Sequence, residues 1–314
     1  MSLLVSILIP CYNSAKYIAE TISCCINQDY PNIEVIVVDD GSVDNSYEIA
    51  RSFQSDRVHV FQQENGGACR ARNLAFERSK GDYIMYLDAD DIISRDKISR
   101  QIELLRGSKE GSVATCAWGK FTNSIDDVAP HFSTVYRDYS VSKDLLIELL
   151  DGDMLQTSCW LVPRQIIQKS GAWCEALKIN QDGEFFARVI LNSSNILFSN
   201  EGCVYYRCGV KSSITNQEAS NIKGESLLLS YQLIAKQILA VDRSKRVRLA
   251  LLRNFYSVAY QYYTFPSVLE VAKEECVRLE VSSRDANIGG IGFRVLSYIF
   301  SFWRALEIRN KHTK

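Results

Sequence analysis

The sequence predicts an α/β fold, with a mostly parallel central sheet flanked by helices and a helical C-terminal extension. Two observations predict the first part. Short β-branched apolar runs recur, and they alternate with segments of helical spacing, which is typical of βαβ units. A third observation predicts the extension. From about residue 219 onward the pattern is helical and contains no strong strand.

The N-terminal part alternates regularly between the two patterns. Mostly apolar runs of strand length occupy residues 4–9, 33–38, 58–61 and 83–87, with Ser6, Glu34 and His59 as polar exceptions. Their predominantly apolar character, without strict alternation, suits strands that are covered on both faces. Helical spacing occupies residues 15–28, 45–53 and 68–78. Right-handed crossovers should then connect parallel strands.

The second half is less regular. Strand character returns at residues 113–121, 157–162 and 196–207, and residues 181–191 have the spacing of a helix. We place a domain boundary near residue 215. Residues 1–215 are then expected to form the first domain, and residues 216–314 the helical extension.

Composition and charge narrow the class of protein. Hydrophobic residues make up 46% and charged residues 23%, which is ordinary for a globular protein with a core. The 36 basic and 37 acidic residues give a net charge of −1, so no overall field favours nucleic acid as a partner. No run of 18 apolar residues occurs, the N-terminal segment lacks the features of a signal peptide, and the 10 cysteines include no C-x-x-C pair. We therefore expect a cytoplasmic protein with reduced cysteines.

Acidic residues follow two of the predicted strands. Asp39-Asp40-Gly41-Ser42 comes at the end of one strand, and the D-x-D sequence Asp88-Ala89-Asp90 comes at the end of another. Ligands bind at the carboxyl ends of parallel strands, so both clusters should meet in one crevice. Carboxylates held close together repel one another unless a cation lies between them, and Mg²⁺ or Mn²⁺ with a diphosphate would fit. The alternative is that each cluster is a polar turn that caps the next helix.

Four ordered motifs extend this pattern. They are residues 9–13 (IPCYN), 38–44 (VDDGSVD), 65–73 (from NGG to ARN) and 81–91 (from GDYI to LDADD). In order, spacing and strand context they resemble glycosyltransferase family 2, and the likeness covers about residues 3–215. The resemblance implies the GT-A fold, an inverting hexosyltransferase facing the cytosol, a nucleotide-diphospho-sugar donor and a divalent metal, Mn²⁺ or Mg²⁺.

The resemblance also implies roles at the nucleotide. Tyr12 would stack on the nucleobase, which the backbone around Pro10 would border. Asp40 would accept a hydrogen bond from the base, as expected for the uracil or thymine of a UDP- or dTDP-sugar, and Asp39 would help to hold the nucleoside. The alternative for Tyr12 is a plain core aromatic residue.

Further roles follow at the diphosphate. Asp88 would lie near the ribose and the metal, and Asp90 would ligate the metal directly. Arg72 would lie near the donor phosphates or hold the acidic loop. Its alternative is a structural ion pair in the wall of the site.

Inverting transfer requires a base that takes the proton of the acceptor hydroxyl. The three histidines, His59, His131 and His312, lie in no recognisable motif. By resemblance the base is Asp182, although Gln181 stands where the family usually has Glu. The alternative is that Asp182 only favours the N-terminus of its helix.

Residues 171–175 (GAWCE) resemble a family segment that includes Glu175. Trp173 and Trp160 would stack on a sugar ring, or else belong to the core. Downstream, Arg207 and Lys211 resemble a basic loop that closes over the diphosphate and stabilises the leaving group. The alternative is an exposed loop.

The C-terminal extension carries no recognised motif. Residues 291–308 are rich in aromatic and arginine side chains, which suits a peripheral helix on an anionic membrane or a helix packed on the catalytic domain or a dimer partner. The expected acceptor is a glycan or lipid-linked saccharide in cell-surface polysaccharide or glycan biosynthesis. Two alternatives stay open for the whole chain: a non-catalytic nucleotide-sugar-binding subunit, and a nucleotidyltransferase.

Overall fold

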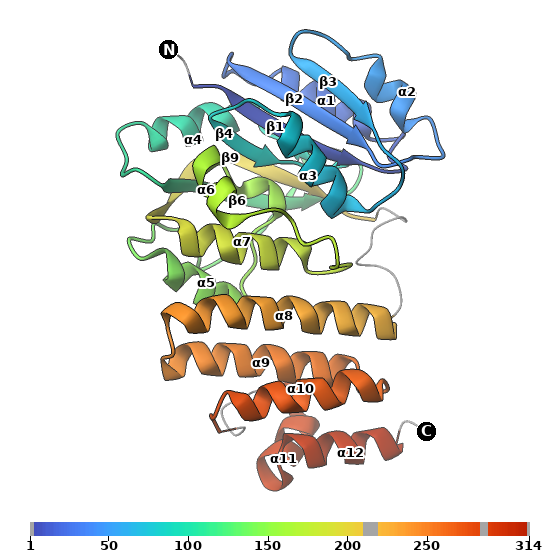
Figure 1. Ribbon diagram of the computed structural model, residues 1–314, viewed down its shortest axis with the longest axis vertical. Coiled ribbons are helices and arrows are strands. Elements are labelled where there is room, and N and C mark those ends of the chain that lie inside the picture. Colours follow the sequence, from blue (N-terminus) through green and yellow to red (C-terminus); the bar gives the residue numbers. More distant parts are fainter. Residues whose placement is uncertain (1–2, 210–218, 283–287, 313–314) are drawn as a thin grey trace. The chain divides into compact units, whose positions relative to one another are not determined.

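The computed structural model describes residues 3–209, 219–282 and 288–312 (Figure 1). The chain divides into two compact units. Unit 1 comprises residues 1–145, 153–175 and 192–216, and unit 2 comprises residues 146–152, 176–191 and 217–314. Each unit is considered by itself.

Unit 1 is built on a five-stranded sheet with the strand order β3-β2-β1-β4-β8. Its strands are β1 (Val5–Cys11), β2 (Ile33–Asp39), β3 (Val58–Gln62), β4 (Tyr83–Tyr86) and β8 (Val162–Pro163). The first four are parallel, and β8 joins β4 antiparallel. β2 is buried along its whole length, as its apolar sequence predicts for a strand covered on both faces.

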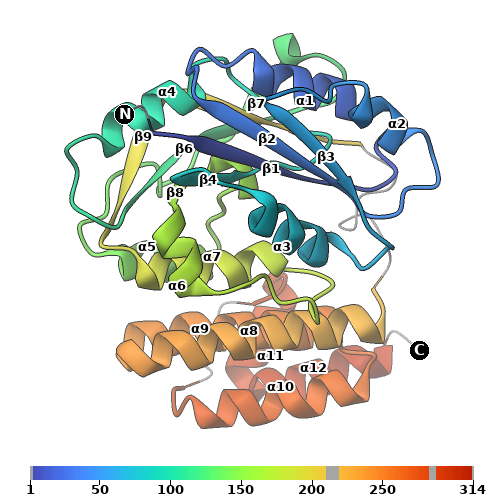
Figure 2. The same cartoon turned by 45° about the horizontal axis from the view of Figure 1, so that its top comes forward.

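Helices cover both faces of this sheet. α1 (Ile18–Ile26), α2 (Ser46–Arg51) and α3 (Ala68–Arg78) connect successive parallel strands. α3 packs on β1 and β2, and Figure 2 shows it on the opposite side of the sheet from α1. The predicted mostly parallel sheet flanked by helices is therefore confirmed.

A second sheet of unit 1 has the strand order β5-β9-β6-β7. Its strands are β5 (Ile92–Ile93), β9 (Asn195–Arg207), β6 (Ser112–Phe121) and β7 (Ala129–Pro130), and α4 (Lys97–Leu105) packs on β6 and β9. The long β6 and β9 run parallel, so their carboxyl ends lie together.

The strand predicted over residues 157–162 is wrong. The chain there forms a 3₁₀ turn, Thr157–Cys159, because the amide of Cys159 bonds back to the carbonyl of Gln156. Only Val162 and Pro163 pair with β4. α6 (Arg164–Ser170) follows at once, and the Arg164 amide donates to the Asp82 carbonyl over 2.8 Å.

Unit 2 is helical. It contains most of α7 (Gln181–Asn192), part of α5 (Ser142–Leu150), and the five helices of the C-terminal part: α8 (Asn221–Val241), α9 (Lys245–Gln261), α10 (Pro266–Arg278), α11 (Ile291–Phe300) and α12 (Phe302–His312). Ser220 and Ser244 cap α8 and α9 with their side chains, and Pro266 opens α10.

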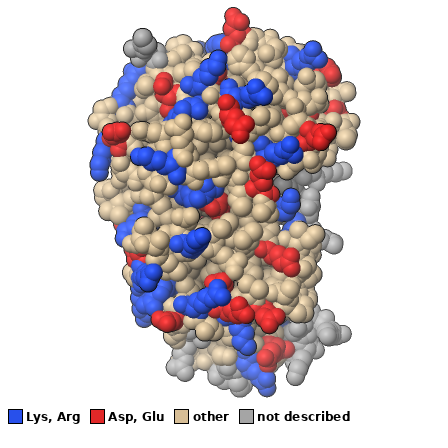
Figure 3. Space-filling view, viewed as in Figure 1, with Lys and Arg blue, Asp and Glu red and all other residues tan. Residues whose placement is uncertain are grey.

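Internal packing uses part of the aromatic C-terminal segment. Phe293 and Phe302 are buried, and Phe302 stacks on Tyr256 with ring centroids 3.9 Å apart. Tyr298 on α11 is exposed. Within the described residues, no helix has the length and apolar character needed to cross a membrane. On the face shown in Figure 3, basic and acidic side chains are interspersed rather than separated by sign.

Candidate active site

The structure brings the predicted strand ends to one edge of the first sheet. In the register, Cys11 of β1 lies opposite Asp39 of β2, which lies opposite Gln62 of β3. On the other side of β1, Leu8 lies opposite Tyr86, one residue before Leu87 and the acidic turn Asp88–Asp91. Tyr12, Asp39, Asp40 and the acidic turn therefore all follow adjacent parallel strands, as the strand-end rule predicts.

Hydrogen bonds join the loop after β1 to the loop after β2. Asn13, whose φ is 47°, donates its amide to Ser42 Oγ over 3.0 Å and accepts the amide of Val43 over 2.9 Å. Asp44 accepts the amides of Ala15 and Ser46. Burial raises the pKa of Asp44, but the hydrogen bonds from Ser46 and Ala15 outweigh it and lower the pKa overall.

Asp40 holds the turn after β3. Its Oδ1 accepts from Gln63 Nε2 over 2.6 Å and from the Gly66 amide over 2.8 Å, and its Oδ2 accepts from the Gly67 amide over 2.8 Å. Gly41, at φ +71°, passes so close to Asn65 that a Cβ would lie 2.9 Å from the Asn65 amide nitrogen. Gly41 of the VDDGS motif and Gly67 of the NGG motif, at φ +93°, thus have backbone conformations that favour glycine.

Asp39 is buried with one oxygen unused. Its Oδ2 accepts from the Ser42 amide and from Gln62 Nε2, whereas its Oδ1 accepts no hydrogen bond from any described residue. A buried acceptor left without a donor costs about 1–3 kcal/mol, so such an atom commonly marks a place for a ligand or water. Tyr12, next to this edge, is 49% exposed, so it is not a core aromatic residue.

Asp88 is held in an ion pair from α3. Arg72 Nη2 lies 2.8 Å from Asp88 Oδ1, and the guanidinium lies over the Trp173 ring at 4.5 Å from its centroid. Trp173 packs edge to face on Tyr86, the last residue of β4. Arg72 therefore links the acidic turn to Trp173, an arrangement that fits both a role in holding the acidic loop and the alternative of a structural ion pair in the wall of the site.

Arg207 clamps the same turn from β9. Its amide donates to Asp91 Oδ1 over 3.0 Å, its Nε donates to the Asp90 carbonyl over 2.8 Å, and its Nη2 pairs with Glu20 over 2.6 Å. Thr21 of α1 adds bonds to the carbonyls of Ala89 and Asp91. Arg207 is the last residue of β9 and is only 6% exposed, so it belongs neither to the predicted loop that closes over the diphosphate nor to an exposed loop. Lys211 lies outside the described residues.

The carboxylates of the acidic turn repel one another. Burial and the charge of Asp88 raise the pKa of Asp90 to about 6, although the charge of Arg207 opposes the shift. Burial and the charges of Asp90 and Asp88 raise the pKa of Asp91 well above its usual range. A cation beside Asp88 and Asp90 would relieve this repulsion.

The donor set suits a hard divalent cation. The described residues contain no cluster of three or more potential metal ligands. Mg²⁺ is nevertheless usually bound by one or two carboxylates, with substrate phosphates and waters completing the octahedron. Asp88 and Asp90 supply such a carboxylate pair, and Asp90 is half-buried at the strand end.

Asn73 of α3 holds the segment around Trp173. Its side chain accepts the amide of Trp173 over 2.8 Å and donates to the Trp173 carbonyl and to Glu175 Oε1 over 3.1 and 2.9 Å. Trp160 and Trp173 are 1% and 2% exposed, and this burial favours the core interpretation for both. Stacking of these rings on a sugar remains a prediction.

Asp182 lies in unit 2, in the first turn of α7. Serines of α8 hold the loop before it: Ser230 Oγ accepts from Asn180 Nδ2 over 2.8 Å, and Ser226 Oγ accepts the amide of Lys178 over 2.7 Å. Burial and the charge of Asp182 raise the pKa of Tyr231 on α8 to about 12. α8 thus holds the loop that precedes the helix turn carrying Asp182.

Sequence reasoning did not identify this support. Ser226 and Ser230 lie about fifty residues after the loop that they hold, and isolated serines in a helix carry no distinctive pattern. Gln181 has a local role, since its Nε2 donates to the Leu177 carbonyl over 2.9 Å. A glutamate at this position could not make that bond when ionised.

Comparisons with known proteins agree with this arrangement. The sequence profile of Glycosyl transferase family 2 matches residues 6–171, more than half of the chain. GlyG, a glycosyltransferase of Streptococcus pneumoniae serotype 4, is 33% identical over 218 residues, which cover 66% of this chain and 71% of GlyG. An uncharacterized glycosyltransferase of Rickettsia typhi is 33% identical over 202 residues, which cover 63% of this chain and 62% of that protein.

Solved structures show the same fold. S. aureus TarS residues 1–349, in complex with UDP-GlcNAc, superposes with a TM-score of 0.73 at 18% identity, covering 99% of this chain and 92% of that 1–349 chain. The fold and the acidic strand-end site define a GT-A type glycosyltransferase. The chain belongs to glycosyltransferase family 2.

Proposed function

We propose that this chain is an inverting, metal-dependent hexosyltransferase that uses a UDP- or dTDP-sugar to extend a cell-surface polysaccharide or glycan. The observation that carries the proposal is the edge of the first sheet. There, exposed Tyr12, the unused Asp39 Oδ1 and the repelling pair Asp88 and Asp90 follow adjacent parallel strands. An aromatic face, a buried acceptor and a carboxylate pair match a nucleobase, an N–H of the base or a hydroxyl of the ribose, and a metal diphosphate.

In this proposal Tyr12 stacks on the base. Among the residues that the structure describes, Gly67 alone donates to Asp40 Oδ2, so this oxygen retains a lone pair for the N–H of uracil or thymine. Asp39 Oδ1 accepts a second donor of the nucleoside. TarS has been solved with UDP-GlcNAc and with UDP, which supports a uridine donor for this chain.

Asp88 and Asp90 would hold Mn²⁺ or Mg²⁺ beside the diphosphate, and the ion would neutralise charge on the leaving group. A mannosyltransferase of Pyrobaculum calidifontis, solved with GDP-Man and Mn²⁺, has the same fold, with a TM-score of 0.56 at 15% identity. Arg72 and Arg207 keep the carboxylates in place: Arg72 pairs with Asp88, and Arg207 binds the turn through Asp90 and Asp91.

Asp182 is proposed as the base. It takes the proton of the acceptor hydroxyl as the acceptor oxygen bonds to the anomeric carbon and the bond from that carbon to the β-phosphate oxygen breaks. The nucleoside diphosphate leaves. The acceptor is proposed to be a glycan or lipid-linked saccharide. The putative teichuronic acid biosynthesis glycosyltransferase TuaG of Bacillus subtilis, 40% identical over 105 residues covering 32% of this chain and 42% of TuaG, supports a role in polysaccharide synthesis.

A donor panel tests the proposal. Purified chain is incubated with Mn²⁺ or Mg²⁺ and UDP-, dTDP- or GDP-sugars, and slow hydrolysis to nucleoside diphosphate is measured. We expect turnover of a UDP- or dTDP-sugar that is lost with chelator and in Asp90→Ala. The matched control is Asp56→Ala, an exposed loop carboxylate, which should hydrolyse the donor normally. Turnover that survives both chelator and Asp90→Ala would contradict metal dependence.

The same panel separates the main alternative, a non-catalytic nucleotide-sugar-binding subunit. That protein would bind a donor in a metal-dependent manner without turning it over, and Asp182→Asn would change nothing. A nucleotidyltransferase would instead release pyrophosphate from a nucleoside triphosphate and a sugar phosphate.

A further inference from the structure

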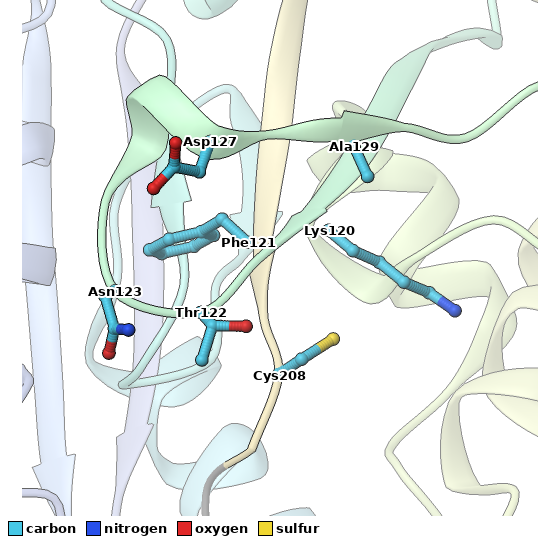
Figure 4. A pocket seen from close by; sticks show the side chains of 7 residues that line it. All are labelled: Lys120, Phe121, Thr122, Asn123, Asp127, Ala129 and Cys208. Atoms are coloured by element: carbon cyan, nitrogen blue, oxygen red, sulfur yellow. The ribbon is translucent and has the colours of Figure 1, made fainter.

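The carboxyl ends of β6 and β9 enclose a pocket of about 460 Å³, here called the β6–β9 pocket. Figure 4 shows Lys120 on β6, Cys208 just after β9, and Asp127 and Ala129 on the segment that crosses above them. Its lining includes Lys120, Phe121, Thr122, Asn123, Asp127 and Cys208. The volume lies within the range of about 300–1,000 Å³ that is usual for small-molecule sites.

Arg207 connects this pocket to the acidic turn. Its guanidinium lies over the ring of Phe121, 4.3 Å from the centroid, while its amide and Nε bind Asp91 and Asp90. Cys208, the next residue, lines the pocket and donates its amide to the Phe121 carbonyl over 2.7 Å. Buried Arg207 therefore contacts both Phe121 of the pocket lining and the acidic turn at the proposed metal site.

We propose that the β6–β9 pocket binds a sugar ring of a neutral glycan acceptor. This assignment rests on the proposed function. In that function the acidic strand ends bind the donor, and the acceptor would bind in the adjoining β6–β9 pocket.

The chemistry of the lining favours a neutral saccharide. Lys120 only donates hydrogen bonds, Asp127 only accepts them, and Asn123 and Thr122 do both. Vicinal sugar hydroxyls both donate and accept, so they can satisfy this mixed set. A phosphodiester offers acceptors alone, and Asp127 would repel it. The side chains of Thr122, Asn123 and Asp127 form no hydrogen bond with any described residue, so they remain available to a ligand.

Cys208 provides a direct probe of occupancy, because it is half-buried in the pocket wall. The full chain is alkylated with N-ethylmaleimide while methyl β-D-glucopyranoside or methyl N-acetyl-β-D-glucosaminide is titrated, and modification of Cys208 is followed by peptide mass spectrometry. A sugar at twice its dissociation constant should slow alkylation by about threefold, since only the free fraction reacts. Cys24, half-buried outside the pocket, is the internal control and should react at an unchanged rate.

Variants and an anionic probe complete the test. Asp127→Asn and Asn123→Ala should lose most of the protection, and the neighbouring Asp126→Asn, which does not line the pocket, should keep it. Glycerol 3-phosphate should not protect. Cys208 alkylation that is insensitive to every glycoside, or that glycerol 3-phosphate slows more than the sugars do, would overturn the inference.

Failure of this inference is distinguishable from failure of the proposed function. The donor panel needs no acceptor, so donor hydrolysis with no sugar protection rejects the pocket assignment alone. Sugar protection without donor turnover or binding rejects the transferase proposal and, with it, the acceptor role of the pocket.

Discussion

Replacing Arg207 tests whether the acidic turn depends on a clamp from the second sheet. Arg207→Lys keeps the positive charge but cannot reproduce the planar fork that reaches the Asp90 carbonyl and Glu20 together. Arg207→Met keeps much of the volume and removes the charge as well. The two variants therefore separate geometry from electrostatics.

The structure sets the size of the effect. The charge-assisted bond to the Asp90 carbonyl contributes about 1.5–3 kcal/mol. The contacts over Phe121 and Tyr17 contribute about 0.5–2 kcal/mol each, and a lysine retains part of this. Glu20 is more than half exposed, so its ion pair adds less than about 1 kcal/mol. We expect Arg207→Lys to lower the free energy of unfolding by about 3 kcal/mol.

Urea denaturation measures the change in the free energy of unfolding. Mn²⁺-dependent UDP binding measures whether the donor site is intact. Arg207→Met should also raise the pKa of Asp90 above about 6, because the charge that opposes its protonation is gone. Metal-dependent binding should then be lost at a higher pH than in the unaltered chain. The control is Arg100→Lys, a half-exposed arginine paired with Glu201, which should cost less than about 1 kcal/mol. Equal losses of unfolding free energy in Arg207→Lys and Arg100→Lys would contradict the claim that Arg207 stabilises the acidic turn.

Four further predictions concern the donor and the base. Tyr12→Ala should weaken nucleotide binding by about 1–3 kcal/mol without lowering stability, since the ring is exposed; an unchanged calorimetric Kd for UDP would exclude stacking. Asp182→Asn should reduce transfer by about 10²–10⁴-fold while donor affinity is preserved, and near-normal kcat would remove Asp182 as the base. Ser230→Ala, which frees Asn180, should lower kcat by about tenfold with donor Kd unchanged, whereas an effect on donor Kd alone would contradict a positioning role. Metal-dependent UDP binding should weaken as the pH falls below about 6, because a proton then competes for Asp90; titration calorimetry that finds constant affinity from pH 7 to about 5 would count against Asp90 as a ligand.

Much of unit 1 was predictable because its signals are local. The apolar runs that became β1 and β2 are buried along most of their length, and their parallel pairing follows from the alternation with helices. The rule that ligands bind at the carboxyl ends of parallel strands predicts that Tyr12, Asp39 and the acidic turn share one edge of the sheet. The strand predicted over residues 157–162 was wrong, because a short run of that length does not distinguish a strand from a tight turn.

The sequence by itself determined the parallel sheet, its acidic edge and the family, because each depends on short-range pattern and on motifs read in order. Only the tertiary structure decided that Arg207 binds a turn 116 residues earlier, that Trp160 and Trp173 are buried, and that Ser230 holds the loop before Asp182. These contacts join residues far apart in the chain. No local periodicity encodes them, since each depends on which surfaces the fold brings together.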